Sequence, residues 1–385
     1  MNNFHKTKKS AAVLKHAILD QYATPFASKT GRWSTGNRVV FIDGYAGPGR
    51  YEDGEEGSGA MLLRKAREMA HFPRRIECHF VESDPETVDR LKAVATAEGA
   101  DVDYTIYDDD ISTHLPELLQ SAEGIPLFTY LDPCGLVIPL DEVASIFQRP
   151  GGYGSPATEV LINLTAHVRR FAGMLYSATP MEGSLQRMDG VCGGDWWRET
   201  WLEKCPTKDA SEDDKMAAEQ AVVEGYAREL CKCAGVAGSW IIDVRPRADL
   251  KPVYYLVFAT RHMDGMVTFG ESASLGLQRW REYLAEVSAQ DTLFGSAAEW
   301  KDEWKKQENV LKAQWIETIA NGITEELAKG EPFRLIERPS VLGGLGGVAR
   351  TLHFRAAIKK VLLAGKTTTD PKGAEDLWNL SIRPA

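Results

Sequence analysis

Acidic residues and glycines gather where apolar runs of the sequence end. The run "RVVFID" ends in Asp43 and leads into "GYAGPG" at residues 44–49, and "IECHFVES" carries Glu82 next to its end. Later, "VDYTIYDDD" ends in the aspartates 108–110, and "PLFTYLDPCG" carries Asp132. Glycines let backbone N–H groups face a ligand directly, because no side chain stands in the way. Carboxylates accept hydrogen bonds from hydroxyl and amino groups. Together these residues indicate a site for a polar, hydrogen-bonding ligand.

The apolar runs predict β-strands that alternate with helices. Five strands are expected, at residues 38–43, 76–83, 102–110, 126–135 and 158–165. Helices are expected at residues 10–24, 57–70, 85–99, 112–122 and 140–148. Strands that alternate with helices form a parallel sheet, and right-handed crossovers place helices on both of its faces. The prediction is an α/β, doubly wound, Rossmann-like sheet, whose strands end together at a crevice where ligands bind.

The pattern changes after residue 165. Residues 166–235 read as helices with no strand between them, which predicts a helical insertion. Strands return at residues 239–246 and 253–262, and the link between them is too short for a crossover helix. They are therefore expected to form an antiparallel pair at the sheet edge. We expect a Rossmann-like domain over residues 1–298 and a small helical or winged-helix-like module over residues 299–385.

The residue types at the crevice favour an adenosine compound. Glu82, at the tip of the second strand, is placed to accept both ribose hydroxyls, and Asp109 is expected near an adenine amino group. A helix cap is the other interpretation of Glu82, although Ser83 or Asp84 can fill that role. Phosphate is disfavoured because carboxylates crowd the crevice and no Walker lysine follows the glycines. The cationic S-adenosylmethionine (SAM) fits better than ATP or NAD. The predicted cofactor-binding residues are Asp43, Gly44, Tyr45, Gly47, Gly49, Glu82, Asp109 and Asp132.

Several longer segments resemble a known family. They are the lysine-bearing first helix at residues 6–26, "FIDGYAGPGRY" with the following "GSG", "YLDPCG", "LINLTAHVRR" and "YYLVFATRH". These segments resemble the three-Cys-motif partner (TcmP-like) family, within the class I SAM-dependent methyltransferase-like proteins. The resemblance covers most of residues 1–265. It implies a methyltransferase sheet closed by an antiparallel hairpin, SAM as cofactor, and a partner protein with three cysteines and suspected radical-SAM-type chemistry. It implies no established substrate.

The predicted catalytic residues lie in the turn "DPCG": Asp132, Pro133 and Cys134. In amino-methyltransferases the acid at this turn holds the target amine, and an aromatic residue after two prolines stacks on a flipped base. This chain has Cys134 and Gly135 there instead, so base N-methylation lacks its usual stacking group unless Tyr45 or Tyr130 replaces it.

Cys134 suggests a second route, because a Pro-Cys pair at this turn resembles the nucleophile of C5-pyrimidine methyltransferases. Such catalysis needs a thiol of lowered pKa, and Asp132 opposes that change. A small buried cysteine is the other interpretation of this residue.

Three basic residues follow the fifth strand and are predicted to bind an anionic substrate, namely His167, Arg169 and Arg170. A surface cluster at a helix start is the alternative interpretation.

Overall composition limits the possible locations and partners. No apolar run is long enough to span a membrane, and the six cysteines form no CxxC pair. These features predict a cytoplasmic protein without a metal site or a membrane contact. The net charge of −10 repels bulk nucleic acid. Residues 331–385 nevertheless hold nine Lys/Arg and five Asp/Glu, which leaves contact with a nucleic acid open for this segment.

Three functions are compatible with these observations. The first is SAM-dependent methyl transfer to a nucleic acid, a nucleoside or a related small molecule, together with a three-Cys-motif partner. The second is a non-catalytic scaffold or specificity subunit, which the altered "DPCG" turn motivates. The third, an NAD-dependent dehydrogenase, is weaker because the glycine spacing departs from G-x-G-x-x-G.

Overall fold

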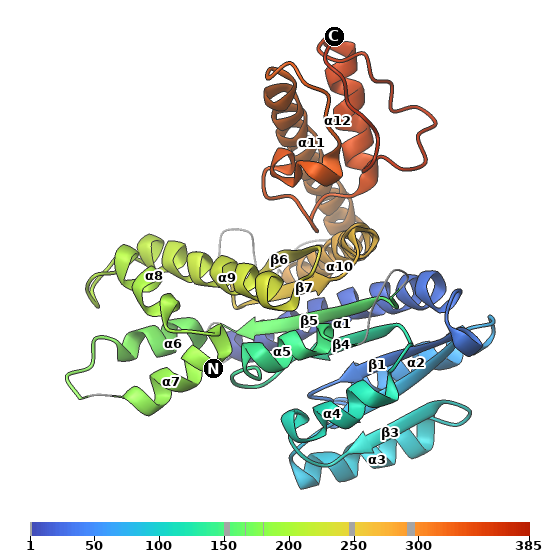
Figure 1. The fold of residues 1–385 in the computed structure, drawn as a ribbon, viewed down its shortest axis with the longest axis vertical. Helices are drawn as coiled ribbons and strands as arrows, with labels where there is room; N and C mark the ends of the chain where they lie inside the picture. Colours follow the sequence, from blue (N-terminus) through green and yellow to red (C-terminus); the bar gives the residue numbers. More distant parts are fainter. Residues whose placement is uncertain (1, 150–154, 166, 180, 246–250, 291–296) are drawn as a thin grey trace. The chain divides into compact units, whose positions relative to one another are not determined.

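A computed structural model describes residues 2–149, 155–165, 167–179, 181–245, 251–290 and 297–385. It contains a seven-stranded sheet with the order β3-β2-β1-β4-β5-β7-β6 (Figure 1). Its strands are β1 (Arg38–Asp43), β2 (Arg75–Val81), β3 (Asp103–Tyr107), β4 (Leu127–Leu131), β5 (Thr158–Thr165), β6 (Gly238–Val244) and β7 (Tyr254–Thr260). The first five strands pair in parallel, while β7 is antiparallel to both β5 and β6.

The position of β7 distinguishes this sheet from dinucleotide-binding sheets. Those sheets have the strand order 3-2-1-4-5-6. Here the antiparallel β7 lies between β5 and β6, which gives the Rossmann-like methyltransferase fold. The predicted doubly wound sheet with an antiparallel hairpin is confirmed, except that residue 246, the predicted end of the first hairpin strand, lies outside the described residues.

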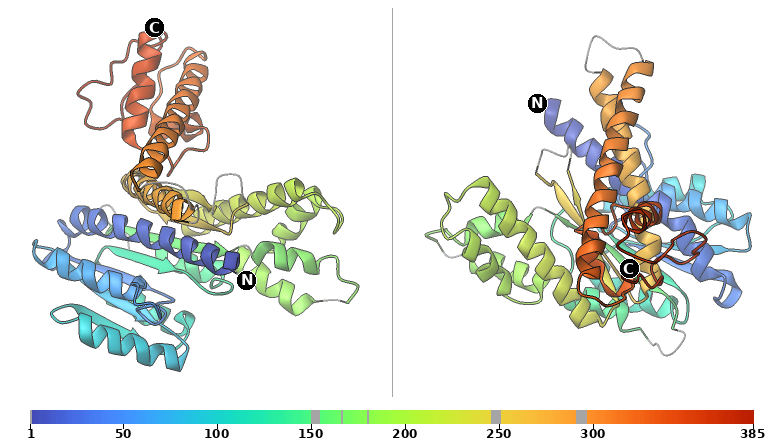
Figure 2. Two further views of the ribbon diagram at one scale, coloured as in Figure 1. Left: turned by 180° about the vertical axis from the view of Figure 1, so that it is seen from behind. Right: turned by 90° about the horizontal axis from the view of Figure 1, so that it is seen from above.

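The described part of the chain forms α-helices before, between and after the strands. In the order of the chain they are α1 (Asn2–Gly31), α2 (Ser58–Ala70), α3 (Pro85–Glu98), α4 (Ile111–Ser121), α5 (Leu140–Phe147), α6 (His167–Met174), α7 (Glu182–Cys192), α8 (Trp196–Lys204), α9 (Glu212–Ala234), α10 (Met263–Gln290), α11 (Ala297–Leu327) and α12 (Thr351–Leu363). Helices α4 and α5 cover one face, and α1, α2 and α3 cover the other (Figures 1 and 2). Helices α6 to α9 form the helical insertion that the sequence predicts after β5.

The period of two along each strand divides the core into two layers. Phe41 and Phe128 point to the sheet face that α1 covers, and their ring centroids are 5.4 Å apart. There the two rings pack against Tyr22 and Phe26 of α1. The opposite face of the same strands packs against α4, α5 and α9. Its buried residues include Val40, Ile42, Leu127, Leu131, Val160, Ile162, Ile111, Val143 and Val222.

Several strands end earlier than the sequence predicted, and the difference is largest at β3 and β4. β3 ends at Tyr107, and β4 ends at Leu131. Asp110 takes the N-cap position of α4, so the three aspartates belong to a turn and not to the strand. Pro133 has no N–H with which to continue a strand ladder. The predicted site residues therefore lie in loops just beyond the sheet, where side chains are free to face a ligand.

The chain divides into two compact units, one of residues 19–266 and one of residues 1–18 with 267–385. The first contains the sheet and all the predicted site residues. In the second, α11 and α12 pack together, and Gly322 is needed because a Cβ there would lie 2.2 Å from the carbonyl oxygen of Val341. Within residues 297–385 the β-structure consists of isolated bridges, so this segment is helical and not winged. Across the described part of the chain, no helix has the length and hydropathy to cross a membrane.

Candidate active site

The parallel register brings the predicted site residues to one edge of the sheet. Asp43 at the end of β1 is level with Phe80 of β2 and with Tyr130 of β4. Glu82 follows β2 directly, and Asp132 follows β4 directly. The carboxyl ends of these strands therefore place three carboxyl groups around the end of β1.

The glycine loop after β1 is tied to both neighbouring strands. The Gly44 N–H donates to the Tyr130 carbonyl at 2.9 Å, and the Ala46 N–H donates to the Val81 carbonyl at 2.9 Å. A Cβ on Gly44 would lie 2.5 Å from the Cδ1 atom of Ile111, so this glycine is required for packing. The loop thus has a fixed path across the ends of β2, β1 and β4.

Within the loop of residues 44–49, Gly47 faces open space. Its φ of +60° lies in the left-handed region, and no described heavy atom lies within 4 Å of the position that a Cβ would take. Its N–H donates to Glu82 Oε2 at 3.0 Å. Gly49, also with a positive φ of +77°, closes the turn by accepting the Gly57 N–H at 2.8 Å. The backbone at Gly47 is therefore accessible to a ligand beside Glu82.

Two backbone amides orient the Glu82 carboxylate. Oε2 accepts from Gly47, and Oε1 accepts from the Asp84 N–H at 2.9 Å. Helix α3 is capped by Asp84, whose side chain accepts the Thr87 N–H at 2.9 Å. The residue that caps α3 is therefore Asp84 and not Glu82. Because a carboxylate accepts up to about four hydrogen bonds, Glu82 keeps lone pairs for a ligand.

Asp43 is fully buried and only partly hydrogen-bonded. Its Oδ1 accepts the Tyr45 N–H at 3.3 Å, whereas Oδ2 has no hydrogen-bond partner in the described part of the chain. The pKa of Asp43 is raised to about 7, chiefly by burial; the Ser58 hydroxyl and the Tyr45 amide oppose this rise, and the nearby Asp132 and Glu82 carboxylates add to it. A buried acceptor without a hydrogen-bond partner destabilises the folded state. Asp43 Oδ2 is therefore a position where a bound ligand would supply the missing hydrogen bond.

Asp132 is held by two side chains. The Tyr130 hydroxyl donates to Oδ2 at 2.9 Å, and the Asn163 Nδ2 group donates to Oδ1 at 2.5 Å. Tyr130 is 1% exposed, so its ring belongs to the core and cannot stack on a substrate. The next residue, Pro133, is buried, and Cys134 is exposed. The interpretation of Cys134 as a small buried cysteine is therefore wrong.

Two residues of this site were not singled out from the sequence. Asn163 of β5 is 4% exposed, and its Oδ1 atom finds no hydrogen-bond donor among the residues that the structure describes. Tyr51 is 42% exposed, yet burial around its hydroxyl, followed by the charges of Asp132, Asp43 and Cys134, raises its pKa to about 12. The charges of the "DPCG" turn therefore act on the Tyr51 hydroxyl. A polar residue inside the apolar run "LINLT" was a usable signal for Asn163.

The remaining cofactor candidates are Asp109 and Tyr45. Asp109 is exposed, and its Oδ1 accepts the N–H of Asp110 at 2.7 Å. Tyr45 is half-buried, and burial followed by the charges of Asp110 and Glu142 raises its pKa to about 12. Tyr45 therefore lies near the starts of α4 and α5.

The residues of α6 that were predicted to bind an anionic substrate have different surroundings. Arg169 forms ion pairs with Glu219 at 2.8 Å and with Glu212 at 3.0 Å, both on α9. Its guanidinium group is thus engaged with acidic partners that the sequence reasoning did not consider. Arg170 is exposed. The side chain of His167 lies outside the described residues.

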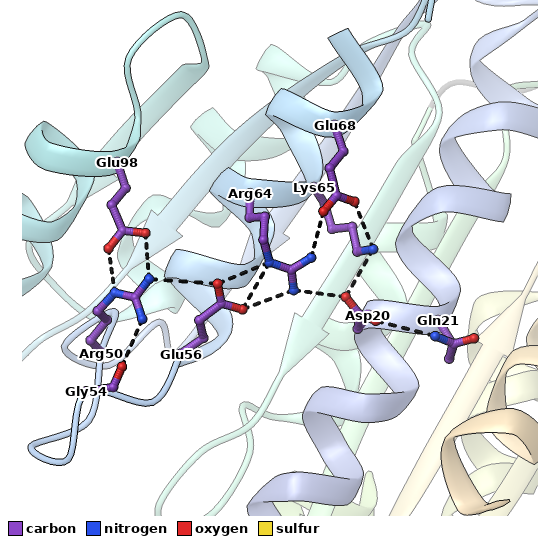
Figure 3. A network of polar contacts seen from close by, with 9 residues as sticks. All are labelled: Asp20, Gln21, Arg50, Gly54, Glu56, Arg64, Lys65, Glu68 and Glu98. Atoms are coloured by element: carbon purple, nitrogen blue, oxygen red, sulfur yellow. Dashed lines mark hydrogen bonds and ion pairs between the residues drawn. The ribbon is translucent and has the colours of Figure 1, made fainter. Parts of the chain in front are cut away.

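An ion-pair network holds the segment of the loop that carries Tyr51 (Figure 3). Arg50 donates to both oxygens of Glu98 on α3, at 2.5 and 2.9 Å. Arg64 of α2 contacts Glu56 and Asp20 at 3.0 Å each. Exposed pairs contribute little singly, but these contacts connect the loop to α1, α2 and α3. The carboxylate of Glu56 is paired with the Arg64 guanidinium group.

The comparisons with known proteins found similar solved structures but no matching family model or curated protein. No family model and no curated protein matches the chain. The chain is similar to a crystal structure of cofactor-bound Rv0187 from MTB, with 13% identity over 66% of this chain and 89% of that one, and a TM-score of 0.28. It is also similar to geranyl diphosphate methyltransferase in complex with GPP and sinefungin, with 11% identity over 62% of this chain and 79% of that one, and a TM-score of 0.24. Both TM-scores lie below 0.5, so the function is argued from the geometry of the site, and membership of the three-Cys-motif partner family stays a prediction.

Proposed function

We propose that this chain is a SAM-dependent methyltransferase that binds its cofactor at the carboxyl ends of β1, β2 and β4. The observation that carries the proposal is the pairing of Gly47 with Glu82 at 3.0 Å, next to open space on the other side of Gly47. A ribose placed there meets an oriented carboxylate, and the glycine leaves room for the rest of the nucleoside.

The charge of the site suits SAM. The carboxylates of Glu82 and Asp132 lie at the end of β1, on either side of the buried Asp43, and such a site repels phosphate but attracts a sulfonium. Glu82 would hold the ribose, Asp109 the adenine amino group, and the backbone of the glycine loop the amino-acid part. When bound, SAM supplies an electrophilic methyl group. Asp132, fixed by Tyr130 and Asn163, would face the methyl acceptor.

The finer parts of the proposal concern substrate, partner and location. The acceptor is a nucleic acid, a nucleoside or a related small molecule, and the chain acts in the cytoplasm with a partner that bears three cysteines. Residues 331–385 would contact the nucleic acid or the partner. In this segment Arg334 pairs with Glu337, Arg338 with Glu326 and Lys360 with Glu317, which reduces the free positive charge.

Titration calorimetry with SAM tests the proposal. We expect saturable binding to the unmodified chain and much weaker binding to Glu82→Ala. Phe72→Ala is a matched control, because Phe72 is 63% exposed and comes just before the opposite, amino end of β2. Absence of SAM binding to the unmodified chain would refute the proposal.

An activity assay on the same protein tests the non-catalytic alternative. That alternative is motivated by the absence of an aromatic residue after Pro133. A methyltransferase releases S-adenosylhomocysteine once an acceptor is supplied. Saturable SAM binding without any S-adenosylhomocysteine, across nucleic acids, nucleosides and the partner, would favour a scaffold or specificity subunit.

A further inference from the structure

A cavity of about 460 Å³ opens at the amino ends of β1, β2 and β3. Its walls are formed by residues 36–37 before β1, residues 73–76 around the start of β2, residues 101–103 around the start of β3, and Ala66 and Ala70 of α2. The candidate active site lies at the carboxyl ends of the same strands. The six residues of β1 separate the two ends by roughly 17 Å, at about 3.3 Å per residue. A ligand in this cavity would therefore not compete with one in the candidate active site.

The two chain segments beside the cavity are packed directly against each other. The Arg74 Nε group donates to the Ser28 carbonyl at 3.3 Å. A Cβ on Gly31 would lie 3.1 Å from the Cδ atom of Arg74 and 3.3 Å from the Asn37 carbonyl oxygen. The segment that follows α1 and the segment that precedes β2 therefore form one surface.

Two large aromatic side chains on this surface are open to solvent. Trp33 is 81% exposed and Phe72 is 63% exposed, although such residues are buried in most proteins. Phe72 directly precedes Pro73 of the cavity wall, and Trp33 comes three residues before Gly36 of the opposite wall. The Cζ atom of Arg32 lies 5.0 Å from the centroid of the Trp33 ring. The rim of the cavity thus carries two aromatic rings and a guanidinium group.

The two segments are basic although the chain as a whole is acidic. The net charge of the chain is −10, but residues 28–38 hold three Lys/Arg and residues 71–75 hold two, with no Asp/Glu in either segment. Arg32 and Arg74 have no carboxylate partner in the part of the chain that the structure describes. Arg32 lies over the Trp33 ring, and Arg74 donates to backbone carbonyls. Their positive charges are therefore available to an anionic ligand.

The acidic residues near the cavity do not cancel this charge. Asp103 accepts two hydrogen bonds from Arg75, one of them at 2.8 Å, and Glu77 pairs with Arg38. Asp101 is exposed on the cavity wall. These three carboxylates, set against the five basic residues of the two segments, leave a net charge of 5 − 3 = +2 around the cavity. The local charge favours an anionic partner.

We propose that single-stranded nucleic acid binds to this amino-edge surface, which is formed by Arg32, Trp33, Phe72 and Arg74 around the cavity. Bases stack on the two exposed rings, and the arginines contact phosphates. A duplex keeps its bases stacked inside and would use the charges without the rings. An acidic peptide likewise has no need of two exposed aromatic rings. The amino-edge surface does not depend on the proposed methyltransferase function, because it lies at the opposite ends of the strands.

Fluorescence anisotropy with labelled oligonucleotides of about 12 nucleotides tests the proposal on the unmodified full chain. The probes are single-stranded DNA, single-stranded RNA and duplex DNA of one mixed sequence. We expect saturable binding of at least one single strand, about tenfold or more tighter than binding of the duplex, since each stacked base adds about that much affinity. No binding of either single strand at low salt would overturn the proposal and leave a protein as the partner of the exposed rings.

Substitutions of the two rings separate stacking from apolar packing. Trp33→Leu and Phe72→Leu keep an apolar side chain but remove the ring, and each should weaken the preferred single strand about tenfold. Trp33→Phe and Phe72→Tyr keep a ring and should bind within about threefold of the unmodified chain. Both side chains are exposed, so the urea midpoint of unfolding should stay the same in all four variants.

The salt dependence of binding tests the arginines. A plot of log affinity against log salt concentration should lose about 0.7 from its slope in Arg74→Ala and again in Arg32→Ala, as expected for one lost phosphate contact on a single strand. Arg187→Ala is the matched control, because Arg187 is an exposed arginine of α7 with no ion pair among the described residues. It should leave both the slope and the affinity unchanged.

Unchanged binding in Trp33→Leu, Phe72→Leu and Arg74→Ala would show that the strand binds elsewhere, for example on residues 331–385, and would overturn the proposal. The titrations contain no SAM. A negative result here therefore leaves the proposed methyltransferase function intact, and a failure of SAM to bind leaves the amino-edge surface intact.

Discussion

Glu82 and Asp84 are two carboxylates that lie two residues apart and have separate tasks in this structure. Glu82 accepts from the Gly47 and Asp84 amides and is proposed to hold a ribose, whereas Asp84 caps α3 through Thr87. Replacing each by alanine therefore separates ligand binding from helix capping. The two substitutions remove the same charge from nearly the same place, so general electrostatics cannot explain a difference between them.

The size of the Glu82 effect follows from the bonds that are lost. Two ribose hydroxyls donate to a carboxylate, and a hydrogen bond to a charged group contributes about 1.5–3 kcal/mol. Loss of both weakens SAM binding by at least about 3 kcal/mol, and 1.4 kcal/mol corresponds to a tenfold change in the dissociation constant. Glu82→Ala should therefore raise the dissociation constant of SAM by about a hundredfold or more. Glu82→Gln keeps one acceptor oxygen and should have a smaller effect.

Calorimetric titration with SAM and urea unfolding measure the two properties on the same samples. Asp84→Ala should lower the urea midpoint, because α3 loses its cap, and should leave the SAM dissociation constant within a factor of about three of the original. If Glu82→Ala binds SAM as tightly as the unmodified chain, Glu82 does not hold the ribose and the placement of the cofactor is wrong.

Three further predictions concern the end of β1. Gly44→Ala places a methyl group 2.5 Å from the Ile111 side chain and should cost about 1–3 kcal/mol in the free energy of unfolding, as measured with urea. Gly47→Ala meets no described atom but has to adopt a φ of +60°, so it should cost about 1 kcal/mol of stability and weaken SAM binding in calorimetry; unchanged affinity would argue against a ligand at this turn. Because the pKa of Asp43 is raised to about 7, the folded chain keeps a proton that the unfolded chain loses between about pH 4 and pH 7. The stability of the unmodified chain should therefore fall through this range relative to Asp43→Asn, by roughly 4 kcal/mol at most, and parallel urea-stability curves for the two proteins would contradict the raised pKa.

The fold followed closely from local patterns in the sequence. β-branched runs that alternate with amphipathic helices predicted the parallel strands, and the short link before residue 253 predicted the antiparallel pair. Strand ends were less predictable, because the aspartates at 108–110 are compatible both with an edge strand and with a helix cap. In the structure Asp110 occupies the N-cap position of α4, so the helix-cap interpretation is the correct one.

The site was predicted only where its residues follow strands directly. Asp43, Glu82 and Asp132 share one edge because parallel strands end together. Tyr51 was missed because its position depends on the clamp between Arg50 and Glu98, which are 48 residues apart. Such long-range pairing leaves no local pattern in a single sequence.

The interaction of Arg169 was missed for the same reason. A basic residue after a strand is expected to face the crevice, but Glu219, 50 residues away, returns on α9 to pair with it. The order of the helices in the insertion, and not the residue type, determines this partner.

The most direct test of the account is a crystal structure of the chain grown with SAM. The account predicts that the ribose hydroxyls lie within hydrogen-bond distance of Glu82, that the backbone at Gly47 contacts the nucleoside, and that the methyl group points toward Asp132. SAM bound elsewhere on the chain, or no bound SAM at a saturating concentration, would contradict it.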